Sequence, residues 1–160
     1  AYIKEQALTD EQTGAMRTYL VRDIETDELA GYFSLKSGMV SLNEREIINS
    51  DGTTSITFDT VPGIEVANFA VNDAYLQNHD NVRGLGIMIF RSFIRVIAQH
   101  NAENVGSMLL YIFALPFDSL IERYKNVYSF LRLEKTEEDG LHKRLKPFYD
   151  QSCIFMYQML

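Results

Sequence analysis

Residues 64–115 constrain the fold most, because they predict a strand, a helix and a second strand in succession. Ile64 to Val71 is rich in β-branched and apolar residues, which favours a strand. Residues 84–100 place apolar side chains at helical spacing, which predicts an amphipathic helix. Met108 to Leu115 is apolar nearly throughout, as expected of a central strand. A helix between two strands of one sheet brings those strands parallel, so we expect an α/β domain.

The rest of the chain adds strands and one more helix around this unit. Two β-rich runs, Thr18 to Arg22 and Leu29 to Leu35, flank a short polar turn and predict an antiparallel hairpin. Asp118 follows Pro116 and is expected to cap a second helix that ends near Val127. Further expected elements are a frayed helix over 1–16 and strands over 128–133 and 153–159, with loops over 43–60, 72–82 and 134–147. Together they predict a mixed sheet with helices on its faces.

Composition narrows the class of protein. The chain has 160 residues, which is enough for one domain with a buried core. There are 15 Lys and Arg residues against 22 Asp and Glu residues, so the net charge is −7. A basic nucleic-acid-binding module is disfavoured, because neutralising phosphates needs the opposite charge.

Cysteine, histidine and hydropathy exclude several kinds of site. Cys153 is the only cysteine, so an internal disulfide and a cysteine-rich zinc site are excluded. The histidines are scattered without metal-ligand spacing, and no metal is expected. No apolar run reaches the ~18 residues that span a membrane. These features favour a cytoplasmic protein with no membrane segment.

The loop Arg83-Gly84-Leu85-Gly86 opens the first predicted helix. Unpaired N–H groups in a first helical turn favour an anion, above all a phosphate, and the Arg83 guanidinium suits phosphate oxygens. No Gly-Lys-Ser/Thr follows, so this is not a Walker P-loop, and the third glycine of the dinucleotide fingerprint is missing. On spacing alone, a plain glycine-rich turn with a solvated Arg83 is the better interpretation.

The strand over 64–71 and the loop over 83–86, taken together, resemble a segment of a known protein family. The run Ile64 to Val71, followed by Arg83-Gly84-Leu85-Gly86, resembles the acetyl-CoA-binding segment of the GNAT acetyltransferase superfamily. Arg83 and Gly86 match the family's fixed positions, whereas Met88 stands where Gly or Ala is usual. The resemblance implies an α/β (α+β) fold, with a mixed, mostly antiparallel sheet, a splayed central strand pair and helices on both faces. It also implies a single domain over residues 1–160 that lacks the family's N-terminal strand and helices.

The same resemblance implies acetyl-CoA as the cofactor and gives its binding residues. The pyrophosphate is expected on the loop, at Arg83, Gly84, Leu85, Gly86 and Ile87. The pantetheine arm is expected to pair with the backbone of the splayed strand, at Phe69, Ala70 and Val71.

Two residues are implied for catalysis. Tyr124 matches the family's tyrosine that protonates the leaving thiolate. The Gly-Phe pair that usually follows this tyrosine is missing here, so Tyr128 is the alternative candidate for the same role. Glu65 lies where some members place a base, with water as the other acceptor for the proton. The strand period of two would put Glu65, Phe69 and Val71 on one face, along the cofactor.

The implied function is an acetyl-CoA-dependent N-acetyltransferase that moves an acetyl group to a primary amine by direct attack in a ternary complex. The net charge of −7 suits a cationic peptide, a polyamine or another small amine as acceptor and disfavours nucleic acid, with tRNA kept as an acceptor only through the resemblance. The runs Thr18 to Val21 and Gly31 to Leu35 are similar to those of small bacterial members, some of which are toxins that acetylate charged tRNA. A homodimer is expected from the family.

A non-catalytic acyl-CoA-binding or interaction module of the same fold is the alternative. Met88, the long loop 72–82 and the missing Gly-Phe step would each be signs of a degraded cofactor site. The basic cluster Lys143, Arg144 and Lys146 is interpreted as a solvated loop, with a phosphate of CoA or RNA as the second possibility.

Overall fold

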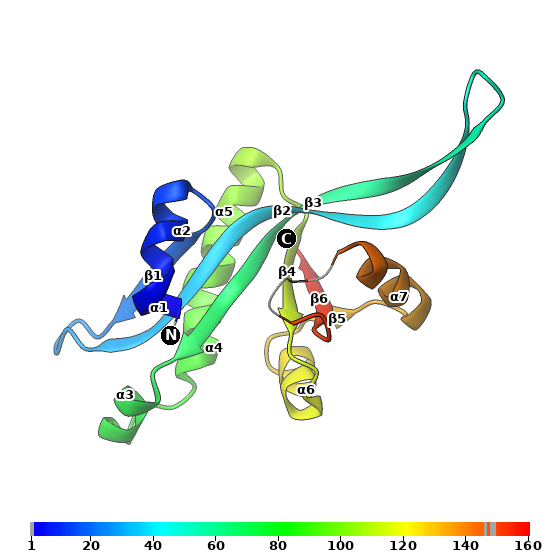
Figure 1. Cartoon of the computed structure of the whole chain (residues 1–160). Coiled ribbons are helices and arrows are strands. Elements are labelled where there is room, and N and C mark those ends of the chain that lie inside the picture. Colours follow the sequence, from blue (N-terminus) through cyan, green and yellow to red (C-terminus); the bar gives the residue numbers. More distant parts are fainter. Residues whose placement is uncertain (1, 146, 148–149) are drawn as a thin grey trace.

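The computed structural model describes residues 2–145, 147 and 150–160. One six-stranded sheet runs through them in the order β1-β2-β3-β4-β6-β5 (Figure 1). The strands are β1 (Arg17–Arg22), β2 (Leu29–Ile48), β3 (Thr54–Val71), β4 (Leu109–Ala114), β5 (Leu131–Arg132) and β6 (Ile154–Met159). The helices are α1 (Tyr2–Glu5), α2 (Ala7–Thr13), α3 (Asp73–Asn78), α4 (Leu85–Ile89), the π-helical turn η1 (Phe90–Ile94), α5 (Arg95–Val105), α6 (Asp118–Asn126) and α7 (Lys135–Arg144).

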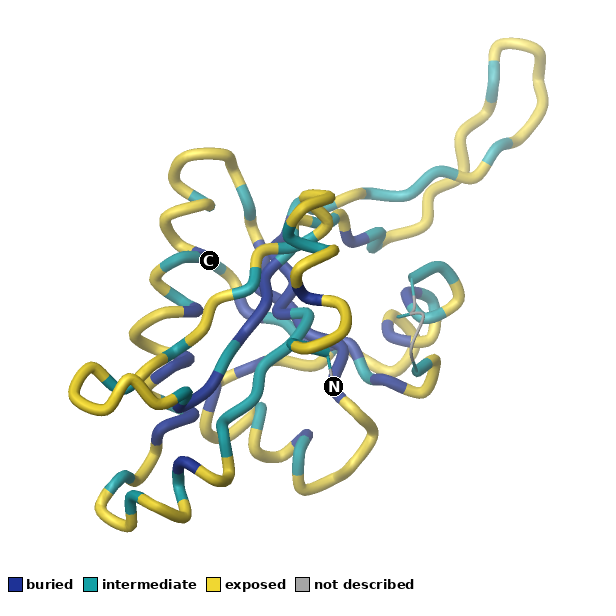
Figure 2. Tube along the Cα trace, turned by 60° about the vertical axis from the view of Figure 1, so that its left-hand side comes forward, coloured by how far each residue is buried: buried dark blue, intermediate teal, exposed yellow. Residues whose placement is uncertain are grey.

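The expected fold class is confirmed. Every strand pair is antiparallel except β3 with β4, which is parallel. One face of the sheet packs against α4, η1, α5 and α6 through the larger core cluster, which includes Phe33, Ile94 and Ile121. The other face carries α1, α2 and α7, and a second cluster there contains Leu141 and Phe155 (Figures 1 and 2). No helix among the described residues is long and apolar enough to cross a membrane.

The two central strands, β3 and β4, separate after a short contact. They pair only at Gly63↔Leu109, Ile64↔Leu110 and Glu65↔Tyr111. Beyond Glu65, β3 keeps its pairing with β2, while β4 continues beside β6. We call this divergence the fork, with Glu65 at its vertex.

A bulge in β3 lies immediately past the vertex. Val66 pairs with Leu35 and Asn68 pairs with Ser34, so Ala67 is the extra residue between them. An extra residue shifts the alternation of faces by one position. Even-numbered residues before Ala67 and odd-numbered residues after it therefore lie on the same face of the sheet.

Residues 43–60, expected to be a loop, instead form the outer parts of β2 and β3. These strands stay in register from Glu44↔Phe58 to Ile48↔Thr54 and project from the body as a two-stranded ribbon (Figure 1). We call residues 41–60 the ribbon. Most of its side chains meet solvent on both faces (Figure 2). The alternation of apolar and polar residues that marks a half-buried strand is therefore weak in the sequence.

Two further predicted loops contain helices. In the loop 72–82, the Asn72 side chain accepts a hydrogen bond from the Ala74 N–H at 3.1 Å and donates one to the Leu29 carbonyl at 2.7 Å, which starts α3. The charged stretch 134–147 contains α7, which buries Leu141 completely. Lone buried positions in polar sequence give no helical periodicity to detect.

Some helices and strands begin or end at other residues than predicted. The first long helix runs on to Val105 with a π-helical turn inside it, and the strand expected over 128–133 is only Leu131–Arg132. Asp118 does not cap α6; Phe117 is the N-cap residue, without a side-chain hydrogen bond, and Asp118 is the first helical residue.

One ion pair fastens α7 to the edge strand β5. Arg132 donates to both carboxylate oxygens of Glu138, at 2.5 Å and 2.8 Å, and Glu138 is only 2% exposed. These hydrogen bonds hold the pKa of the Glu138 carboxyl below its usual range, against the opposing effect of burial. A lowered folded-state pKa stabilises the fold above the unfolded-state pKa, and this contribution is lost as the pH falls through the folded-state value.

We expect Glu138→Gln to lower the free energy of unfolding at pH 7 by about 1–2 kcal/mol, since it leaves Arg132 without its charged partner. Its stability should also change less than that of the unaltered protein between about pH 5 and pH 3. Urea unfolding across that range measures both effects. The exposed neighbour Glu137→Gln is the matched control, and equal losses in the two variants would contradict the role of this ion pair.

Candidate functional site

The fork opens a cavity between β3 and β4 of about 420 Å³. One wall is β3 from Val66 to Phe69, and the other is β4 with Leu115 after it. The free edge of β3 beyond Glu65 has no strand partner among the described residues, so its N–H and C=O groups are available to an extended ligand. The expected pantetheine residues Phe69, Ala70 and Val71 lie along this stretch of β3.

Aromatic side chains close the inner end of the cavity. Tyr124 of α6 lies in its lining together with Phe90 and Phe130. The Tyr124 ring contacts that of Phe130 edge-on, with centroids 5.7 Å apart. Burial, helped by the neighbouring Tyr128, raises the pKa of Tyr124 to about 12. The hydroxyl therefore stays protonated at neutral pH and can donate a proton into the cavity.

Tyr128 lies elsewhere in the same aromatic cluster. It is buried and does not line the cavity; its ring packs on Phe90 at 5.0 Å and Phe69 at 6.0 Å. A Cβ placed on Gly86 would come within 2.9 Å of the Tyr128 hydroxyl. Of the two tyrosines considered from sequence, Tyr124 is thus the one that faces the cavity.

The turn after α6 explains the missing Gly-Phe step. Ser129 has a φ of +61°, a left-handed conformation that favours glycine, and Phe130 follows it into the core. The Gln158 side chain donates to the Tyr128 carbonyl and holds this turn against β6. A serine therefore adopts the backbone conformation for which the resemblance expects glycine.

The loop 83–86 leads into α4 beside the cavity wall. Gly84 has a φ of +68° and is the N-cap residue, and the first hydrogen bond of the helix joins the Met88 N–H to the Gly84 carbonyl at 3.0 Å. The N–H groups of Leu85, Gly86 and Ile87 consequently have no acceptor within the helix. They form a donor set at the positive end of a long helical segment.

A cation that the sequence analysis missed lies at this helix start. One terminal nitrogen of Arg123, on α6, is 3.9 Å from the position of a Cβ on Gly86. Arg83 is exposed on the loop itself, and Met88 is 42% exposed. The helical periodicity of α6 does not indicate that Arg123 faces α4. Its position beside the loop therefore could not be predicted from the sequence.

Glu65 lies on a different face from the one expected. Ile64 and Val66 before the bulge, and Phe69 and Val71 after it, all join the core beneath α4 and α5, whereas Glu65 does not. The bulge at Ala67 breaks the period of two on which the expectation rested. Glu65 therefore points to the face opposite the loop.

There Glu65 joins three neighbouring strands at the vertex. Its carboxylate is 3.2 Å from the Lys36 ammonium on β2 and accepts a hydrogen bond from Tyr111 on β4. Burial, followed by the charge and hydrogen bond of Glu65, raises the pKa of the Tyr111 hydroxyl well above its usual value. Glu65 itself is only 5% exposed.

The remaining candidates lie away from the cavity. Arg144, from the predicted basic cluster, packs against the ribbon, and Lys146 lies outside the described residues. No group of three or more His, Cys, Asp or Glu side chains among the described residues is arranged to hold a metal ion. Cys153 is buried and free.

Solved structures share this fold, although no protein-family model matches the sequence. A Tyr-to-Phe mutant of the toxin AtaT superposes with a TM-score of 0.64 at 14% identity, covering 99% of this chain and 74% of the toxin. A Tyr-to-Phe mutant of KacT gives a TM-score of 0.64 at 14% identity, covering 99% of this chain and 79% of KacT. AtaT in complex with acetyl-methionyl-tRNA gives 0.62 at 14% identity, with coverages of 99% and 79%.

The chain has the GNAT fold of these toxins.

We expect Gly86→Ala to lower the free energy of unfolding by about 1–3 kcal/mol, because the added methyl group overpacks against the Tyr128 hydroxyl. Tyr128→Phe removes that hydroxyl, so the alanine should cost much less in the Tyr128→Phe background. Chemical denaturation of the four proteins of this double-mutant cycle measures the difference. An equal cost in both backgrounds would show that Tyr128 does not set the need for glycine.

Proposed function

We propose that this chain is an acetyl-CoA-dependent N-acetyltransferase that transfers an acetyl group to a primary amine. The observation that carries the proposal is the fork: the free edge of β3 and Tyr124 line one cavity, and Phe90, from the helical segment that begins at the donor set, lines it too. AtaT, which has this fold, has been solved with acetyl-CoA bound.

The residues present fit acetyl-CoA. The unpaired N–H groups of Leu85, Gly86 and Ile87, with Arg83 and Arg123 beside them, suit the pyrophosphate. Gly86 keeps this helix start close to α6, since a Cβ there would come 2.9 Å from the Tyr128 hydroxyl and 3.9 Å from a terminal nitrogen of Arg123. The β3 edge from Phe69 to Val71 suits the amide-bearing pantetheine arm.

The chain's own residues divide the chemistry between them. When bound, acetyl-CoA supplies the thioester that the amine attacks. Tyr124 holds its proton until it can be given to the departing thiolate sulfur. The proton of the attacking amine goes to Glu65, at the vertex where β3 and β4 separate, or to water. The ion pair of Glu65 with Lys36 keeps that carboxylate in place.

For the acceptor, we propose the α-amino group of an aminoacyl-tRNA, as in the toxin branch of the family. The reaction would then take place in the cytoplasm of a bacterium. AtaT has been solved with acetyl-methionyl-tRNA, which supports this choice. Residues 81–102 contain Arg83, Arg91 and Arg95 and no Asp or Glu, so the helix beside the site is basic although the whole chain carries −7. A local basic surface of this kind suits phosphates.

A thermal melt with acetyl-CoA, followed by a thiol-release assay with a panel of amines, tests the function. We expect excess acetyl-CoA at about 100 times its Kd to add about 2.7 kcal/mol and to raise the Tm by several degrees. Arg123→Ala and Arg83→Ala should reduce this shift, and Arg45→Ala, on the ribbon that projects from the body, should not. Aminoacyl-tRNA should release CoA faster than a polyamine or a basic peptide does.

The outcomes separate the alternatives. Binding without CoA release from any amine would favour the non-catalytic module, and release with the small amines alone would reject tRNA as the acceptor. A cooperative melt that acetyl-CoA leaves unchanged would contradict the cofactor.

We expect Tyr124→Phe to lower kcat more than about tenfold with the KM for acetyl-CoA little changed, because the lost hydroxyl acts only as the thiolate leaves. In the unaltered protein the rate should rise until the amine is neutral and then stay level to about pH 10, since Tyr124 titrates only near 12. Tyr128→Phe is the matched control and should keep kcat within about threefold. A larger loss in Tyr128→Phe than in Tyr124→Phe would move the acid to Tyr128.

A further inference from the structure

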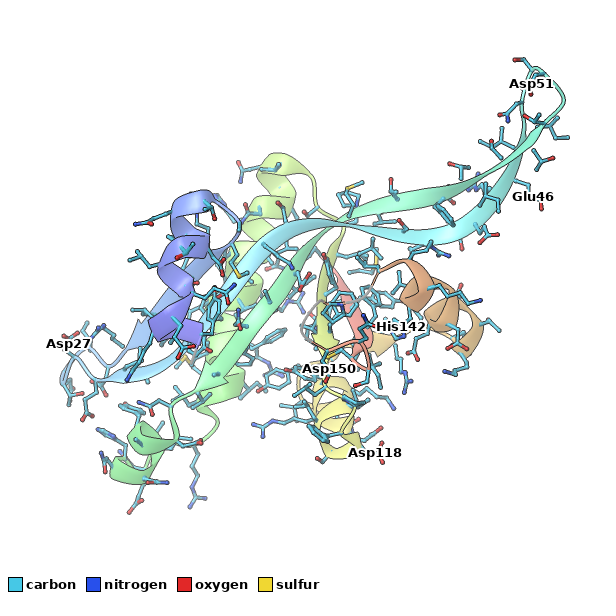
Figure 3. All side chains as sticks on the ribbon, in the orientation of Figure 1. Asp27, Glu46, Asp51, Asp118, His142 and Asp150 are labelled. Carbon is cyan, nitrogen blue, oxygen red and sulfur yellow. The ribbon has the colours of Figure 1, made fainter. Side chains whose placement is uncertain are left out.

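The ribbon carries a surface that the proposed reaction does not use. Beyond Ser41 its two strands pair only with each other; at the base α7 packs against β2, and Leu42 packs on the second core cluster (Figure 1). A two-stranded ribbon is marginally stable in water unless one face packs against something. Figure 3 shows Glu46 and Asp51 on its outer half, well away from the body.

The two faces of the ribbon differ in chemistry. The register puts Arg45, Ile47 and Thr57 on one face, where Arg45 is paired with Asp59 at 2.6 Å. The opposite face, which we call the inner face, presents acidic and apolar side chains side by side: Glu44, Glu46, Ile48, Thr54, Ile56 and Phe58.

The base of the inner face is already occupied by a cation of this chain. The Arg144 guanidinium of α7 lies 4.4 Å from the centre of the Phe58 ring and 3.9 Å from a carboxylate oxygen of Glu44. It also donates to the Leu42 carbonyl at 2.9 Å. A carboxylate beside an apolar side chain thus binds an arginine through charge, ring face and backbone together.

A second pair of a carboxylate and an apolar side chain lies two residues further along the ribbon, and no cation of the described residues is bound to it. Glu46 pairs with Ile56 on the inner face just as Glu44 pairs with Phe58. Ile56 is 57% exposed and Ile48 beyond it 79% exposed. Among the described residues, no ion pair or hydrogen bond reaches the Glu46 carboxylate.

We propose that the inner face of the ribbon docks a basic, apolar segment of a partner protein, with an arginine or lysine on Glu46 and apolar side chains on Ile48 and Ile56. Charge complementarity selects this occupant. The ribbon has four carboxylates and one arginine, so nucleic acid and lipid phosphates are repelled. A second copy would bring another −7 charge to the same surface. The inference is independent of acetyl transfer.

The test uses the full chain and a short fluorescent peptide of arginine and leucine, with a twin in which glutamate replaces arginine. We expect the basic peptide to bind, its twin not to bind, and hydrogen exchange of the amides of residues 44–58 to slow when the basic peptide is added. Glu46→Lys and Ile56→Ser should each weaken binding at least about fivefold, as central interface positions do. Both variants should release CoA from acetyl-CoA at the rate of the unaltered chain. This keeps the test distinct from that of the proposed function.

Matched controls exclude a general attraction to an acidic protein. Glu25→Lys makes the same charge change on the β1–β2 turn, and Ile47→Ser removes an exposed isoleucine from the outer face of the ribbon; both should bind within about twofold of the unaltered chain. Equal weakening by Glu46→Lys and Glu25→Lys would overturn the proposal. So would sedimentation that shows a dimer which Ile56→Ser dissociates, because the occupant would then be a second copy.

Discussion

The separation of β3 from β4 after Glu65 is the constraint on which the rest of the molecule depends. Parallel strands that stayed paired would satisfy each other's backbone groups and leave no cavity. Here three residue pairs fix the two strands together, and the Lys36–Glu65–Tyr111 contacts reinforce the last of them on the face opposite α4. Past that point no strand among the described residues pairs with this edge of β3, and the cavity lies where the partner strand has diverged.

The bulge at Ala67 decides which side chains belong to the cavity and which to the opposite face. With unbroken alternation, Glu65 and Phe69 would share a face. The extra residue instead sends Phe69 under α4 with Tyr128 and leaves Glu65 with Lys36. The bulge therefore leaves a buried carboxylate on one face of the sheet and aromatic side chains on the other. One inserted residue provides this without changing the order of strands.

The sequence predicted the parts of the fold whose side chains are buried in a regular pattern. Phe33, Ile94 and Leu110 lie at strand or helix spacing, and the hairpin, the long helix and the central strand followed from such residues. The ribbon, α3 and α7 were missed because their stability comes from a few specific contacts, such as Asn72 with Leu29 and Arg132 with Glu138. The loop and Tyr124 could be expected from a motif, whereas Arg123 and the face of Glu65 depend on packing angles and on a bulge, neither of which has a sequence signal.

The net charge of −7 conceals two regions of opposite sign. Residues 81–102, which include the loop and most of the helix after it, carry Arg83, Arg91 and Arg95 and no carboxylate, and the ribbon carries four carboxylates against one arginine. Figure 1 places these regions on different parts of the molecule, with the ribbon projecting beyond the sheet and α4 beside the fork. Charges at such a separation are screened from each other at physiological salt, so each acts on its own ligand. Phosphate-bearing ligands are attracted to the α4 end, and a basic protein segment bound to the ribbon would leave the cavity open to them.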